Sequence, residues 1–113
     1  MEKNIALGES NVQAFFQDTN NPEEIAKTLS AFANSEGGKL ILGLKKNGKI
    51  TGINPVDELK NIERIIKAYT TPDLLFLAET RDLGFRKILI ISIEKSEFIK
   101  YEVIGKENIK EMQ

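Results

Sequence analysis

The chain has 113 residues and a formal net charge of −1, and it contains neither cysteine nor histidine. This length predicts a single domain over residues 1–113, with residues 1–8 and 109–113 at its periphery. The missing residue types exclude disulfides, thiolate metal sites, imidazole-based hydrolysis and most zinc sites. The longest apolar runs are strand-sized, so we expect a cytoplasmic protein with no leader and no membrane partner.

Charge is distributed unevenly along the chain. Residues 1–36 sum to −4, whereas residues 37–56 sum to +4 because they hold four lysines and no acid. These lysines are Lys39, Lys45, Lys46 and Lys49. A near-neutral chain is not typical of a general nucleic-acid binder, but a local cationic cluster indicates an anionic partner. The simpler alternative, that these are solvated lysines around a turn, fits the sequence equally well.

The first clear element is a helix that begins after Asn21. Asn21 can cap it, Pro22 suits its first position, and Glu24 completes a capping box. Apolar residues then recur at helical spacing until Gly37-Gly38, which predicts an end near residues 34–36. Before this helix, residues 14–16 could form a short strand.

A buried strand and a turn follow the glycine pair. Residues 39–44 (KLILGL) are apolar on both alternating faces, which indicates a central strand covered on both sides. Gly43 within it suggests a close backbone approach or a bulge. Asn47-Gly48 predicts a hairpin turn, with residues 49–53 as the return strand.

The second half of the sequence predicts one helix and further strands. A helix is predicted over about residues 56–68, with an apolar face of Leu59, Ile62 and Ile66 that continues at Tyr69. Residues 74–78 and 87–93 read as two strands deep in a sheet, joined by a loop at 81–84. Residues 100–104 could add a short strand. The predicted fold class is therefore α+β: a single mixed β-sheet of about five to six strands with two packing helices.

Several blocks of this sequence resemble a known family. They are Gly8-Glu9-Ser10, the stretch AFANSEGGKLILGL at 31–44, and NGKITGI at 47–53. Together they resemble the Schlafen-type Alba-like domain, also called the Schlafen or divergent-AAA-associated DNA-binding domain, over about residues 7–108. The resemblance implies nucleic-acid binding in regulator-like proteins, with DNA favoured over RNA. Such domains are often followed by others, so the chain is expected to be a stand-alone module or a piece of a larger protein.

The departures from the family pattern bear on catalysis. Some relatives resemble metal-assisted ribonucleases with three carboxylates, which suit Mg²⁺ or Mn²⁺. Here Glu9 alone remains, as a vestigial acidic site. The family's Glu-Phe-Lys element falls on Phe15-Phe16-Gln17, Lys45-Lys46 replace aspartates, and Val103 replaces an arginine. We therefore predict no catalytic residue, no metal, no cofactor and no enzyme activity.

The predicted function is weak, mainly electrostatic nucleic-acid binding by the four lysines Lys39, Lys45, Lys46 and Lys49. Arg86 and Lys87 are interpreted as charges that protect a strand edge, and the aromatic residues as core rather than a stacking platform. No Gly-Lys-Ser/Thr follows Gly37-Gly38, so no nucleotide site is expected. The alternative is a protein-interaction module, a homodimer in which residues 87–93 pair across the interface, that has lost its nucleic-acid ligand.

Overall fold

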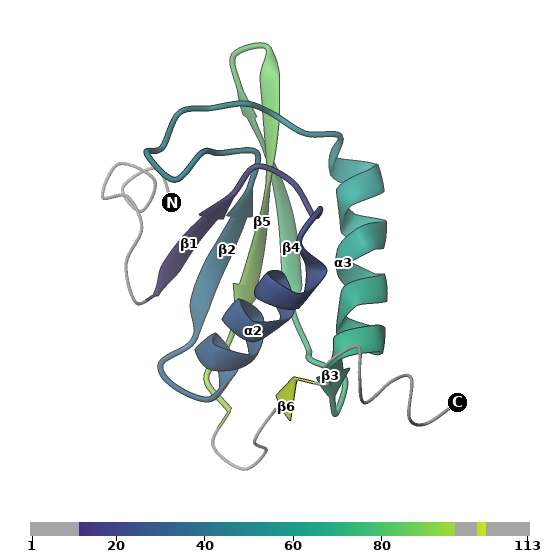
Figure 1. Ribbon diagram of the computed structural model, residues 1–113. Helices are drawn as coiled ribbons and strands as arrows, with labels where there is room; N and C mark the ends of the chain where they lie inside the picture. The colour runs from purple at the N-terminus through teal and green to yellow at the C-terminus, as the bar shows by residue number, and fades with distance from the viewer. Residues whose placement is uncertain (1–11, 97–101, 104–113) are drawn as a thin grey trace.

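The computed structural model describes residues 12–96 and 102–103 (Figure 1). Within them the chain forms two helices and six strands. In chain order these are β1 (Gln13–Phe16), α2 (Pro22–Ala33), β2 (Gly38–Leu42), α3 (Pro55–Tyr69), β3 (Thr70–Thr71), β4 (Leu77–Leu83), β5 (Arg86–Ile93) and β6 (Glu102–Val103). Glu9 and the predicted peripheral segments, 1–8 and 109–113, lie outside the described residues.

The strands form one four-stranded and one two-stranded sheet. The larger sheet has the order β1-β2-β5-β4, with β1 parallel to β2 and the other neighbours antiparallel. β3 and β6 pair with each other. The α+β class with a mixed sheet is confirmed. Within residues 12–96 and 102–103 the six strands divide into two sheets, rather than forming the single sheet of five to six strands that the sequence predicts. The predicted return strand at 49–53 does not form, because β1 and β5 already occupy both edges of β2.

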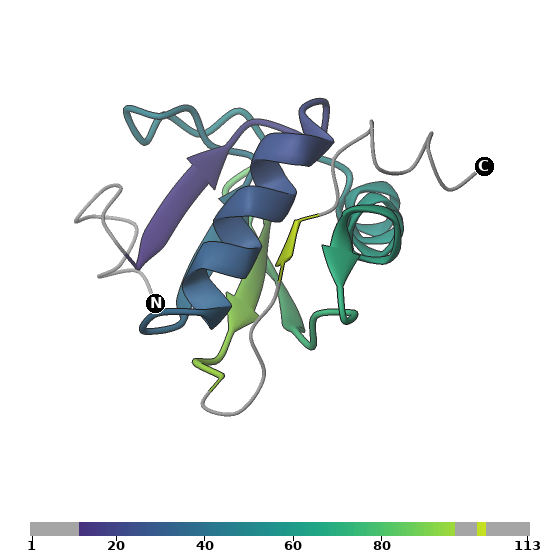
Figure 2. The same cartoon turned by 60° about the horizontal axis from the view of Figure 1, so that its bottom comes forward.

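Both helices begin within one residue of the predicted start, and an asparagine caps each one. The Asn21 side chain accepts from the amide of Glu24, and the Asn54 side chain accepts from those of Val56 and Asp57. Such caps satisfy amides that otherwise lack a partner in the first helical turn. The helices cover one face of the four-stranded sheet (Figures 1 and 2).

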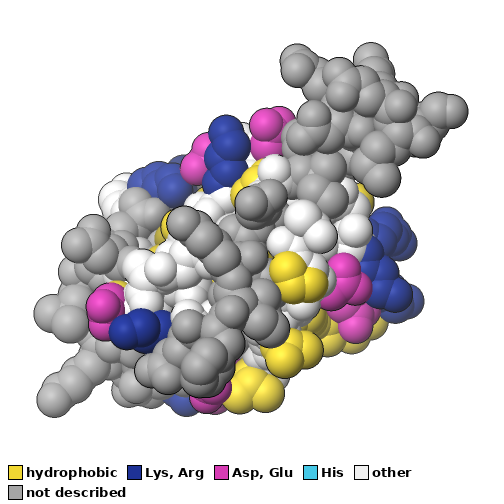
Figure 3. Space-filling view, turned by 90° about the horizontal axis from the view of Figure 1, so that it is seen from below, with side chains coloured by type: hydrophobic (Ala, Val, Ile, Leu, Met, Phe, Trp, Pro, Cys, Tyr) yellow, Lys and Arg dark blue, Asp and Glu magenta, His cyan; other side chains and the backbone are white. Residues whose placement is uncertain are grey.

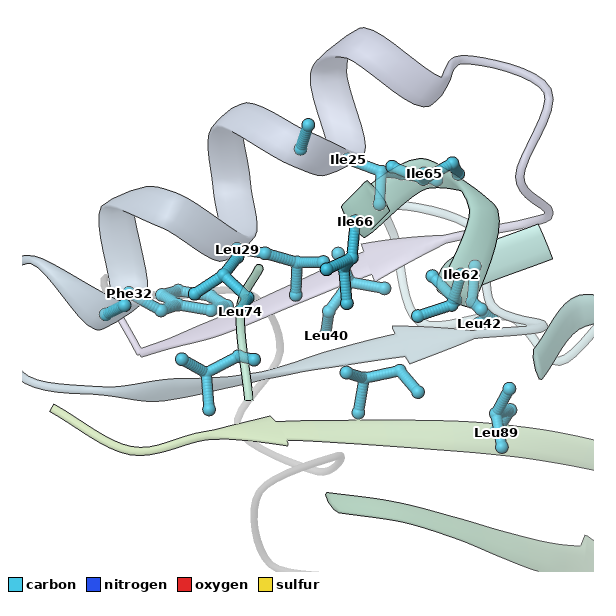
Figure 4. Packing of buried hydrophobic residues seen from close by; sticks show 14 residues of the cluster. Ile25, Leu29, Phe32, Leu40, Leu42, Ile62, Ile65, Ile66, Leu74 and Leu89 are labelled. Carbon is cyan, nitrogen blue, oxygen red and sulfur yellow. The ribbon is translucent and has the colours of Figure 1, made fainter. Parts of the chain in front are cut away.

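The main core lies between this face and the helices (Figure 4). Ile25 and Leu29 of α2 and Ile62 and Ile66 of α3 pack there with alternate residues of β2 and β5. A smaller cluster occupies the other face and consists of Phe15, Ile41, Leu44, Ile88 and Ile90. β2 and β5 are therefore apolar on both faces because both faces are buried, as the sequence predicts.

Gly38 is required by packing. A Cβ atom on this residue would lie 2.6 Å from ring carbons of Phe32, which is buried at the end of α2. The glycine thus lets the first residue of β2 pass directly under the ring. The Gly-Gly break predicted to end the helix also sets the approach between α2 and the sheet.

The β4 region corrects two predictions. The strand spans Leu77–Leu83 rather than 74–78, and its turn is Gly84-Phe85 rather than 81–84. β4 is an edge strand whose first four residues are exposed, so it is not deep in the sheet. Leu74 is buried against the helices before the strand begins, and this accounts for the apolar run that the sequence assigns to a strand.

Candidate nucleic-acid interface

Hydrogen bonds to Gly43 bring the two ends of the loop between β2 and α3 together. The Gly43 carbonyl accepts hydrogen bonds from the amides of Thr51 (2.8 Å) and Gly52 (3.0 Å). Gly43 has φ +105°, and a Cβ there would lie 3.1 Å from a methyl of Ile88. A residue with a side chain would be strained in this conformation. Gly43 therefore ends the ladder of β2. The loop that follows packs back on the smaller cluster through Leu44 and Ile50, and a Cβ on Gly48 would lie 3.9 Å from the Phe15 ring of β1.

Residues 45–49 form a tight turn at the end of this loop. The Lys45 amide donates to the Lys49 carbonyl (2.9 Å), and the Gly48 amide donates to the Lys45 carbonyl (2.8 Å). Gly48 has φ +91°, and Asn47 Oδ1 accepts from the Lys49 amide at 2.9 Å. This pattern corresponds to a three-residue turn with a glycine bulge. The predicted turn at Asn47-Gly48 is confirmed, although only the single bridge between Leu44 and Ile50 extends it.

The turn places two lysines directly opposite each other. Leu44 and Ile50 form the adjacent cross-strand pair, and both pack against the smaller cluster. Side chains alternate between faces, so Lys45 and Lys49 lie on the opposite, exposed side. Opposed residues of this kind have Cβ atoms about 5 Å apart. No carboxylate of the described segments forms an ion pair with either lysine.

Lys46 is held against β1. Its Nζ lies 4.4 Å from the centroid of the Phe16 ring, within cation–π range. A shallow cavity of about 220 Å³ lies here, lined by residues that include Asp18, Leu44 and Lys46. Asp18 accepts hydrogen bonds from the backbone and side chain of Asn20. The contact with Phe16 fixes the side of the turn on which the Lys46 ammonium group lies.

Arg86 joins the turn from the β4–β5 hairpin. Its Nη1 donates to the Ile50 carbonyl at 3.2 Å, and its side-chain stem lies against Gly52. Lys87 instead pairs with Asp82, with Nζ and Oδ1 2.6 Å apart. The interpretation of Arg86 as a simple edge charge therefore misses a tertiary contact. We call Lys45, Lys46, Lys49 and Arg86 the basic edge.

Phe85 lies beside the basic edge, at the tip of the β4–β5 hairpin. Its relative exposure is 108%, so the whole ring is accessible to solvent. A shallow depression of about 530 Å³ separates the tip from the loop and is lined by Gly52–Pro55 and Phe85–Lys87. The interpretation of the aromatic residues as core is wrong for Phe85, which is exposed next to Arg86. The signal in the sequence was the dipeptide Phe85-Arg86 directly after Gly84.

Lys39 does not belong to the basic edge. It lies near the start of β2, whereas the turn follows the end of that strand, roughly 15–20 Å away for an extended chain. Lys39 is half-buried and its Nζ lies 3.5 Å from Ser92 Oγ. In the part of the chain that the structure describes, no three acidic side chains gather as a metal site.

The structure thus defines a small α+β module that carries a basic turn next to β1 and an exposed aromatic residue at its β4–β5 hairpin. The family model described as Schlafen, AlbA_2 matches residues 9–110, so the chain belongs to this family. The resemblance seen in the sequence is therefore confirmed. No curated protein matches the chain.

Two solved structures share the fold. The N-terminal domain of a Nitrosomonas europaea protein named as related to the ATP-dependent DNA helicase RecG superposes with a TM-score of 0.70 at 17% identity, over 93% of this chain and 78% of that one. The DIP2311 protein of Corynebacterium diphtheriae gives a TM-score of 0.56 at 18% identity, covering 84% of this chain and 25% of that protein. Among the described residues, neither helix has the length and apolar composition to cross a membrane.

Proposed function

We propose that this domain binds nucleic acid weakly and mainly electrostatically, through the basic edge. The observation that carries the proposal is the opposition of Lys45 and Lys49 across one turn. Like charges directly opposite each other destabilise a strand pair. A phosphate bound between the two ammonium groups would relieve this repulsion.

Arg86 and Phe85 extend the proposed surface. Arg86 uses one of its five N–H donors on the Ile50 carbonyl, which anchors the guanidinium group beside the turn. Its remaining donors suit phosphate oxygens. The ring of Phe85 offers a stacking surface for an unpaired base. Lys39, which the sequence places in the same site, is left out of the proposed interface.

Three or four cations support only modest affinity. Each neutralised phosphate contributes by counterion release, so binding should weaken steeply with salt and depend little on sequence. Family membership, and the naming of one structural neighbour after a DNA helicase, support a nucleic-acid partner. We propose further that this partner is DNA rather than RNA and that the domain acts within a regulator-like protein, as the family resemblance implies. We place the domain in the cytoplasm, where nucleic acid is accessible.

We also propose that the domain is not a nuclease. Lys45 and Lys46 stand where relatives of this family carry acids, and ammonium groups there would repel a divalent cation. Incubation with labelled RNA or DNA and Mn²⁺ should yield no cleavage. Cleavage that is lost in a Glu9→Ala variant would refute this part of the proposal.

The second candidate function is a protein-interaction or homodimerisation module without a nucleic-acid ligand. The form that the sequence suggests, pairing of residues 87–93 across a dimer, is wrong because β5 is already paired on both edges. A specific observation still favours an interaction surface, since edge strand β4 is exposed.

Binding of labelled DNA and RNA at low and moderate salt tests the proposal. The variant Lys45→Glu/Lys46→Glu/Lys49→Glu should lose binding. A matched control, Lys27→Glu/Lys60→Glu/Lys67→Glu, changes the net charge equally but alters exposed helical residues elsewhere, and should retain most of it. Equal loss in both variants would show that only net charge matters. No binding of the wild type at low salt would favour the interaction module.

A further inference from the structure

The outer edge of β4 has no partner strand among the described residues. β4 spans seven residues, LAETRDL, and among the described strands it pairs with β5 alone. Proteins commonly protect such edges with prolines, bulges or charged side chains, lysine above all, and the charges of β4 are Glu79, Arg81 and Asp82. β4 contains no proline and no lysine, and its register with β5 is continuous from Leu77 to Leu83. Its main-chain groups therefore form a template for another strand.

One hydrogen bond of β5 identifies which main-chain groups of β4 face outward. The Lys87 carbonyl accepts from the Ile53 amide (3.0 Å), so it is directed away from β4. Lys87 and its partner Asp82 are therefore a non-hydrogen-bonded pair of the β4–β5 ladder. Because antiparallel ladders alternate, the amides and carbonyls of Ala78, Thr80 and Asp82 are directed to the outer edge.

We propose that β4 pairs with β4 of a second copy of this chain, antiparallel and centred on Thr80. In this register Thr80 faces its own symmetry mate and Ala78 faces Asp82, so every outward amide and carbonyl meets an outward partner. Glu79 then faces Arg81 in non-hydrogen-bonded positions, where opposed side chains are closest.

The charges on β4 select this register. Within one chain Arg81 Nη2 lies 2.9 Å from Glu79 Oε2, and both side chains are partly exposed, with relative exposures of 31% and 44%. Pairing about Thr80 brings two such ion pairs together with opposite charges facing across the dyad. The neighbouring registers that preserve the hydrogen-bond alternation are centred on Glu79 or on Arg81, and each places like charges opposite each other. Strand β4 is therefore self-complementary in one register.

The ends of the strand match as well. Leu77 is 69% exposed and would face Leu83 of the second copy, and Leu75, just before the strand, is 82% exposed. Figure 3 shows hydrophobic side chains gathered at the end of the molecule where β4 begins. The product is a continuous eight-stranded sheet with both pairs of helices on one face. Its two basic edges lie at opposite ends and remain accessible, so dimerisation is independent of the proposed nucleic-acid function.

Charge exchange tests the register. In sedimentation experiments from micromolar to millimolar concentration, the wild type should show a monomer–dimer equilibrium. Glu79→Arg alone and Arg81→Glu alone should each remain monomeric, because each places like charges across the dyad. An equimolar mixture of these two variants should form a heterodimer, and the double variant Glu79→Arg/Arg81→Glu should recover the homodimer. Wild-type protein that stays monomeric at millimolar concentration, or single variants that dimerise as it does, would overturn the proposal.

A cysteine scan gives an independent readout, since the chain contains no cysteine. Under mild oxidation Thr80→Cys should form a disulfide dimer, because facing Cα atoms about 5.5 Å apart suit a disulfide. Ala78→Cys is the control, because its two symmetry-related positions are about 13 Å apart along the strands. Equal cross-linking of both variants would refute the register, and circular dichroism verifies that each variant is folded.

Discussion

The exposed ring of Phe85 leads to a sharp prediction about the kind of nucleic acid that is bound. Replacing Phe85 with alanine should leave the fold intact, because the ring is fully exposed at a hairpin tip and contributes no buried contact. Exposed substitutions of this kind usually change the free energy of unfolding by less than about 0.5 kcal/mol. Any loss of binding would then arise in the complex.

The expected loss depends on whether bases are accessible. Stacking of one base on an aromatic side chain contributes about 1–3 kcal/mol, which corresponds to roughly a 5- to 140-fold change in the dissociation constant. Phe85→Ala should lose this factor with a single-stranded oligonucleotide. With duplex DNA, where bases stack on each other, the change should stay below about twofold, since the phosphate contacts of the basic edge remain.

Fluorescence anisotropy at low salt with matched single-stranded and duplex oligonucleotides measures both affinities. Phe85→Trp serves as the control, because it retains an aromatic surface and should bind single strands at least as well as the wild type. Unchanged single-strand affinity in Phe85→Ala would refute stacking. An equal loss with both ligands would show that the side chain acts through the shape of the hairpin.

Three further predictions concern the turn, the sheet and a helix cap. Lys45→Gln/Lys49→Gln should reduce the slope of log affinity against log salt by about 1.8 on duplex DNA, and an unchanged slope in a salt titration would exclude both residues from phosphate contact. Gly38→Ala should lower the free energy of unfolding in urea by about 1–3 kcal/mol, because its methyl would overlap the Phe32 ring at 2.6 Å; wild-type stability would contradict that packing. Asn54→Ala should cost about 1 kcal/mol in the same assay through loss of the α3 cap, and a neutral effect would show that the cap is dispensable.

Local signals in this sequence predict the elements that depend on near neighbours. The Asn21 cap places the start of α2, because a cap bonds amides two or three residues ahead, and apolar spacing places the start of α3 to within one residue. The apolar stretches of β2 and β5 identify the buried strands, since both faces of these strands are covered. The turn at 45–49 follows from the conformational freedom of Gly48.

The predictions from the sequence are wrong where the pairing of a strand depends on segments that are distant in the chain. The residues at 49–53 have strand-like composition, yet β5 takes the edge of β2 that a return strand would need. Leu77 reads as core but is exposed, because β4 is at the edge of the sheet, and Leu75, just before the strand, is exposed as well. Burial depends on sheet order, and composition does not encode sheet order.

The sequence alone determined the family, the α+β class, the helix starts and a lysine-rich turn, because each is encoded by residues close together in the chain. Only the tertiary structure decided which charges share a surface. It brings Arg86 to Ile50 across 36 positions, exposes Phe85 next to Arg86, and separates Lys39 from the other lysines. These relations depend on β5 pairing between β2 and β4, which is a long-range choice set by the burial of two apolar strands against the helices.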